Sequence, residues 1–282
     1  MRRGTFFGIA LAVAAVFFAG WFLQPTGAGR ELVQYAANRG SEEFFAGSVR
    51  LASAVIDRKL RIHLRGLRGE FQSPSGPVPL EIPSADSQGP LTGFFSQEGL
   101  VLNFKASLGQ PTEGRGLDGV LKLRGGKQGF FEVKADVRSL DLHEIEWVNP
   151  ENLSGSAGEM KGDLLIRGDA SGRPFCRLHL QVDEPGGKLQ ARLFDTLKPY
   201  LPEVTVRQKV EKIAGGPALV NYRKARLDLD LPESDRLKIF LHIEVPDYNL
   251  NLNLNIEVRV DSKNAFADLA GLVGLIQKEA NG

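Results

Sequence analysis

Residues 250–260 read Leu250-Asn251-Leu252-Asn253-Leu254-Asn255-Ile256-Glu257-Val258-Arg259-Val260, an unbroken alternation of apolar and polar side chains. Successive side chains of a β-strand point to opposite faces, so this period of two predicts a strand with one apolar face. Asparagine is disfavoured inside strands, and three asparagines between leucines indicate that the other face is in contact with water.

The same period extends toward the N-terminus. The spans Lys224–Leu231, Arg236–Val245 and Tyr248–Asp261 are predicted to be three consecutive strands, and their short connections suit antiparallel neighbours. Four earlier segments alternate in the same way: Leu60–Arg65, Leu100–Leu108, Phe131–Arg138 and Arg177–Val182. The sequence therefore predicts a mainly β protein built from an antiparallel sheet.

Two segments carry apolar residues at helical spacing instead. The segment Lys188–Ala214 predicts one or two short amphipathic helices, with a stop at Pro199 or Pro202. The segment Ala265–Lys278 predicts a further amphipathic helix near the C-terminus. The strands are thus expected to be accompanied by two or three short helices.

The N-terminal residues predict a membrane anchor. Arg2 and Arg3 precede the uncharged run Gly4–Leu23, which matches the roughly 20 apolar residues that cross a bilayer as a helix. The arginines before the run indicate a cytoplasmic N-terminus, with the remainder of the chain on the other side. The alternative is a cleaved signal peptide, because the small residues of Thr26–Gly29 follow the run.

The residues that usually carry catalysis do not form a recognisable motif. Cys176 is the single cysteine, which excludes an intramolecular disulfide and a cysteine metal cluster. His143-Glu144 begins like a zinc-protease motif, but Trp147 stands where the second histidine is required. The other three histidines occupy polar positions of predicted strands: His63, His179 and His242. We therefore predict no enzymatic activity, no metal and no cofactor.

The charge balance argues against a nucleic-acid partner. The 282 residues have a formal net charge of +1, and the basic side chains are spread along the chain rather than clustered with aromatic ones. The more informative feature is the amount of apolar strand face. This face can be buried between two sheets in a closed sandwich, or it can stay partly open to acyl chains on one curled sheet. For the open sheet, the predicted lipid contacts are Leu102, Phe104, Leu250, Leu252, Leu254 and Ile256.

Four features together resemble a known family. They are the run Gly4–Leu23, the phrase Leu153–Leu164, the turn Pro185–Leu189 leading into a predicted helix, and Leu219–Arg223 followed by the three closing strands. The chain resembles the AsmA-like superfamily of Gram-negative envelope proteins, in particular its smaller YdbH-like or dicarboxylate-transport-domain relatives. The resemblance covers roughly residues 115–262. Residues 41–110 are also similar to the N-like accessory protein of type II secretion.

The resemblance implies a domain order of 1–29 as anchor, 30–114 as an N-terminal β region and 115–282 as an AsmA-like β domain with inserted helices and a C-terminal helix. It implies a curled antiparallel sheet, in the form of an open groove or half-barrel, held at the inner membrane with the bulk of the chain in the periplasm. The implied function is phospholipid binding or transfer in outer-membrane biogenesis, with the membrane, phospholipid and other envelope proteins as partners. The alternative is a non-catalytic structural accessory of a secretion or envelope-assembly machine, with a closed β core.

Overall fold

The computed structural model describes residues 50–73, 76–108, 116–125, 129–148, 150–169, 174–201, 203–232 and 236–259. Within these ranges, none of the helices is long and apolar enough to cross a membrane. The predicted anchor Gly4–Leu23 and the predicted helix Ala265–Lys278 lie outside the described residues.

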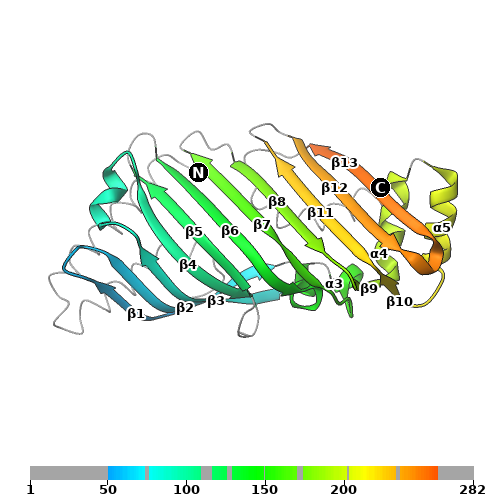
Figure 1. Ribbon diagram of the computed structural model, residues 1–282, viewed down its shortest axis with the longest axis horizontal. Coiled ribbons are helices and arrows are strands. Elements are labelled where there is room, and N and C mark those ends of the chain that lie inside the picture. Colours follow the sequence, from blue (N-terminus) through cyan, green and yellow to red (C-terminus); the bar gives the residue numbers. More distant parts are fainter. Residues whose placement is uncertain are drawn as a thin grey trace. The chain divides into compact units, whose positions relative to one another are not determined.

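The protein is mainly β, as predicted, and its principal sheet has 11 antiparallel strands in the order β1-β2-β3-β4-β5-β6-β7-β8-β11-β12-β13 (Figure 1). The strands are β1 (Arg50–Ile56), β2 (Ile62–Ser73), β3 (Gly76–Ser87), β4 (Leu100–Leu108), β5 (Gly116–Arg124), β6 (Phe130–Asp141), β7 (Glu159–Asp169), β8 (Pro174–Val182), β11 (Lys224–Leu231), β12 (Arg236–Val245) and β13 (Leu250–Arg259). A second sheet pairs β9 (Gly187–Gln190) with β10 (Leu219–Tyr222). The predicted closing strands Lys224–Leu231 and Arg236–Val245 are confirmed, and the third, predicted at Tyr248–Asp261, spans Leu250–Arg259 within the described residues.

The predicted helical segment Lys188–Ala214 is helical from Ala191 onward, but the prediction was wrong for Lys188–Gln190, which pair with β10 as part of β9. The segment contains α4 (Ala191–Leu197), the 3-10 turn η3 (Lys198–Tyr200) and α5 (Val204–Ala214). The α4 helix ends at Leu197, two residues before Pro199, in the region where the sequence predicted a stop. The remaining helical turns are η1 (Leu91–Phe95), η2 (Leu142–Val148), α3 (Pro150–Leu153) and η4 (Pro246–Tyr248).

The contacts divide the chain into two compact units. Unit 1 contains β1, β4, β5 and η1 with most of β2 and β3, and unit 2 contains β8 to β13 with α3, α4 and α5. Strands β6 and β7 are shared, since the division falls after Ala135 in β6 and after Ile166 in β7. The domain limits predicted from the sequence stay a prediction.

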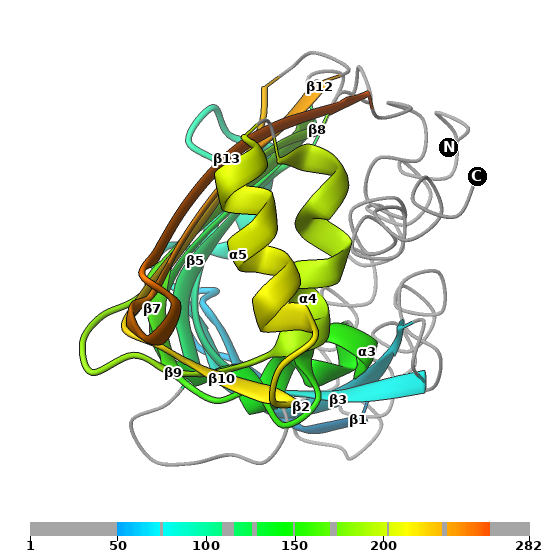
Figure 2. The same ribbon diagram turned by 90° about the vertical axis from the view of Figure 1, so that its right-hand side faces the viewer.

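In unit 2, the strand register sets apolar side chains against apolar side chains. One row across four strands consists of Leu180, Leu227, Leu241 and Leu254. The α4 and α5 helices lie side by side against this face of the unit (Figure 2). Their inward side chains recur at helical spacing and are fully buried: Phe194 on α4, and Val210 and Ile213 on α5. These helices close the core of unit 2 at one end of the strands.

Unit 1 has its own apolar cluster, formed by Ile62, Leu100 and Leu102. The turn η1 covers part of it with Leu91 and Phe94. It is the one helical turn in the described part of unit 1.

Candidate functional site

The first candidate site is the apolar face of β8, β11, β12 and β13 in unit 2. Helices α4 and α5 cover one end of this face, and a separate apolar cluster lies at the other end. At the helix-covered end, the predicted contacts Leu250, Leu252 and Leu254 are buried, and Leu252 is 1% exposed. The α5 helix contacts the start of β13, where Lys209 Nζ donates a hydrogen bond of 2.6 Å to the backbone carbonyl of Asn249. These three leucines therefore belong to a packed core.

The other end of the same strands holds a cluster of Cys176, Leu231, Leu237 and Ile239. Six half-buried apolar side chains pack around this cluster: Leu164, Ile166, Leu227, Leu229, Ile256 and Val258. We call these ten residues the distal apolar cluster. The predicted contact Ile256 is one of them, so the structure separates it from the buried leucines of the same strand.

The other two predicted contacts lie in unit 1. Leu102 is buried in the cluster with Ile62 and Leu100. Phe104 is half-buried, and its ring lies across Gly119 of β5, where an added Cβ would come within 2.5 Å of Phe104 Cζ. The absence of a side chain at Gly119 thus leaves room for the Phe104 ring.

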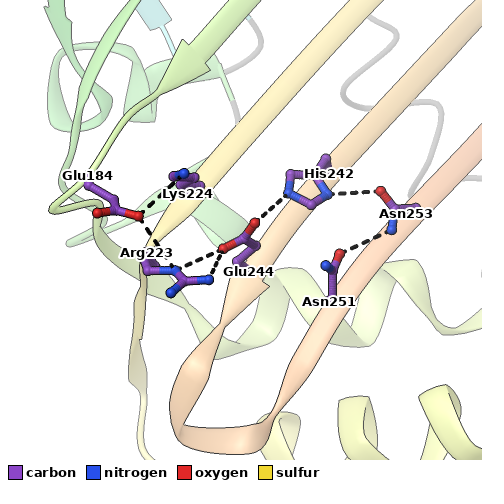
Figure 3. Close-up of polar contacts among 7 residues, drawn as sticks. All are labelled: Glu184, Arg223, Lys224, His242, Glu244, Asn251 and Asn253. Atoms are coloured by element: carbon purple, nitrogen blue, oxygen red, sulfur yellow. Dashed lines mark hydrogen bonds and ion pairs between the residues drawn. The ribbon is translucent and has the colours of Figure 1, made fainter.

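The second candidate site is the polar face of the same unit 2 strands, where side chains form a chain of contacts from Arg223, just before β11, to β13 (Figure 3). Arg223 Nη2 donates to Glu244 Oε2 at 2.7 Å, and His242 Nε2 lies 3.3 Å from Glu244 Oε1. His242 Nδ1 lies 2.8 Å from Asn253 Oδ1, and the Asn253 amide donates to Asn251 Oδ1 at 3.1 Å. The chain of contacts ends on β13.

A second polar group lies across β8 and β11. The imidazole of His179 contacts Asp228, and Arg226 Nε donates to Asp228 Oδ2 at 2.9 Å. Unit 1 repeats the arrangement with His63, whose Nδ1 lies 2.7 Å from the Asp86 carboxylate. The sequence placed these histidines correctly on polar strand positions but did not predict their partners. The partners follow only from the strand register, which sets His179 directly opposite Asp228.

These contacts shift the titration of the carboxylates. Burial acts to raise the pKa of Asp228, but hydrogen bonds from Arg226 and His179 outweigh it, so the pKa lies below the ordinary value of 3.8. The Arg223 guanidinium lowers the pKa of Glu244, partial desolvation opposes that shift, and His242 lowers the pKa further. Both carboxylates are therefore held in the charged form by neighbouring cations.

We expect the protein to lose stability in acid for this reason. A group whose pKa is lower in the folded state stabilises the fold above its unfolded pKa, and this contribution disappears as the pH falls through the folded value. The urea midpoint should thus fall as the pH drops below about 5 and through the lowered pKa values of these carboxylates. The variant Asp228→Asn should be less stable than the parent at pH 7 and lose less on acidification. The exposed Asp136→Asn removes the same charge elsewhere in unit 2 as the control. Equal slopes for all three proteins would contradict the assignment to Asp228.

Neither face presents a set of residues typical of metal binding. Across the described ranges, no three His, Cys, Asp or Glu side chains are close enough together to hold a metal ion. Cys176 is buried and unpaired with another cysteine. Its pKa is raised to about 11, mainly by burial and also by the Asp230 carboxylate, so at neutral pH it is a protonated thiol.

Comparisons with known proteins add no assignment. No family model matches the chain, and neither the curated proteins nor the solved structures contain a significant match to it.

Proposed function

We propose that this chain is a membrane-anchored envelope protein that binds or transfers phospholipid, with the acyl chains lying on the distal apolar cluster. The observation that carries the proposal is the set of six half-buried apolar side chains around Cys176, Leu231, Leu237 and Ile239. An apolar surface of this kind is unfavourable in water and marks a site for a ligand, a membrane or a protein partner. The predicted anchor Gly4–Leu23 and the AsmA-like resemblance support phospholipid as the ligand and the periplasm as the compartment.

The alternation in β13 supports the same proposal, because neighbouring residues of this strand lie alternately in the apolar cluster and on the face exposed to water. Ile256 and Val258 belong to the distal apolar cluster, whereas Asn255 and Glu257 are exposed on the opposite face. A lipid on the cluster would touch the first pair and leave the second pair in water.

Site-specific photo-crosslinking in cells tests the proposal. We expect a benzoyl-phenylalanine at Ile256 or Leu229 to form an adduct with phosphate-labelled phospholipid after irradiation. The same crosslinker at Asn255, next to Ile256 on the polar face, is the matched control. Adducts at Ile256 and none at Asn255 would support lipid on the cluster. Equal adducts at both positions would indicate general membrane proximity, and no adduct at either position would reject the proposal.

A second candidate is a structural accessory of a secretion or envelope-assembly machine, with a closed β core and no lipid. The observation that favours it is the tight burial at the centre of the distal apolar cluster, where Leu231 and Leu237 are each 1% exposed. Such burial is typical of a packed interior rather than of a ligand surface. In the same experiment, this function predicts protein adducts at Leu229 or Ile256 in place of lipid adducts.

A further inference from the structure

We infer that β13 is an interaction edge that pairs, antiparallel, with β13 of a second copy of this chain. The inference goes beyond lipid binding and does not depend on it. β13 is the last strand in the sheet order, and among the residues that the structure describes no strand pairs with its outer side. An unpaired strand edge presents a row of backbone N–H and C=O groups that can extend the sheet with another strand.

The α5 helix contacts β13 at its start, but the strand itself lacks the sequence features that usually prevent such pairing. All ten residues from Leu250 to Arg259 pair with β12 in one continuous register, so the strand is regular along its length. The pairing of β3 with β4, in contrast, shifts register between Glu81 and Ser84. β13 contains neither proline nor lysine, and its two charged residues, Glu257 and Arg259, come at its end. Prolines, bulges and lysines are the usual protection of strand edges.

The polar face of β13 also carries side chains that can form hydrogen bonds with an added strand. The chain of contacts that begins at Arg223 and Glu244 stops at the amides of Asn253 and Asn251 (Figure 3). Asparagine amides carry both donors and acceptors, so each can bond to an equivalent amide on an added strand. Neighbouring asparagines across paired strands are a favourable arrangement in extended sheets.

The sequence of the strand is compatible with itself when two copies run antiparallel. In a register centred on Leu254, Leu252 faces the partner's Ile256, and Asn253 faces the partner's Asn255. Glu257 then faces the partner's Asn251, so no two like charges are opposed. A two-fold pairing of this kind uses the same strand from both copies and closes on itself. Apolar side chains would continue the apolar face across the junction, and polar ones the polar face.

Cysteine crosslinking of the full chain in membranes tests the pairing. A single exposed cysteine is introduced in each of two differently tagged copies expressed together, Asn253→Cys in one and Asn255→Cys in the other, which the proposed register sets opposite each other. Cys176 can stay, because it is buried and its thiol is protonated. With a copper–phenanthroline oxidant, we expect a disulfide between the β13 cysteines of the two tagged copies. Lys238→Cys is the matched control, since Lys238 is exposed on the polar face one strand away from the edge.

Co-purification of the two tags is a second measurement, which does not require the two cysteines to have the geometry of a disulfide. The double variant Asn253→Lys/Asn255→Lys adds charges that would oppose each other across the junction, and we expect co-purification of the two tags to fall about tenfold. Asn103→Lys, on the exposed face of the inner strand β4, should leave co-purification unchanged. Crosslinks at Lys238 as strong as those on β13, or adducts that join β13 to another protein, would overturn the inference. So would the absence of both a crosslink and co-purification. The photo-crosslinking test of lipid binding at Ile256 is a separate experiment, so either proposal can fail without the other.

Discussion

The variant Leu252→Asp is expected to unfold at a much lower urea concentration than the parent protein, with a loss of about 4 kcal/mol or more in the free energy of unfolding. Leu252 is 1% exposed and lies on the strand that α5 packs against. An aspartate at this position either stays charged without a partner in an apolar core or takes up a proton, and both outcomes are costly. Circular dichroism of the full-length protein during urea unfolding measures the change.

Two matched variants on the same strand serve as comparisons for Leu252→Asp. Asn253→Asp adds the same charge on the exposed face, and we expect a change within about 0.5 kcal/mol. Ile256→Asp adds it at a half-buried position of the distal apolar cluster, where part of the side chain reaches water, and we expect a loss of about 1–2 kcal/mol. If phospholipid occupies the cluster, Ile256→Asp should also reduce lipid crosslinking from Leu229. A Leu252→Asp protein as stable as the parent would show that the helix-covered end is open to water.

The variant Phe194→Ala should also be strongly destabilised, by about 3–5 kcal/mol. Phe194 is 0% exposed on α4, and this helix contacts α3, α5 and β9. Removing the ring deletes apolar contacts and leaves a cavity between these elements, because a short helix fixed on several sides collapses only partly. The same urea titration measures the loss.

Phe95→Ala makes the same chemical change at an exposed site. Phe95 is 66% exposed on η1 and contacts Phe94 edge-to-face, with ring centroids 5.1 Å apart. We expect a loss below about 1 kcal/mol from this pair. A similar loss for both variants would mean that Phe194 is not a core residue, and that α4 and α5 do not close unit 2.

Prediction from the sequence was most accurate where the signal is local. The predicted strands Lys224–Leu231 and Arg236–Val245 coincide with β11 and β12, and the helical segment between β9 and β10 was recognised from its spacing. It was least informative where residues distant in sequence meet. His179 and Asp228 are 49 positions apart, and only the pairing of β8 with β11 sets them opposite each other.

The sequence by itself determined which side chains of β13 share a face. Alternation is a property of a single extended strand, so Leu250, Leu252, Leu254 and Ile256 had to point one way and the asparagines the other. Only the tertiary structure decided that Leu252 is sealed in a core while Ile256, four residues later, stays half-buried. That difference depends on where α4 and α5 pack against the sheet, and the apolar pattern of the strand is the same under the helices as beyond them.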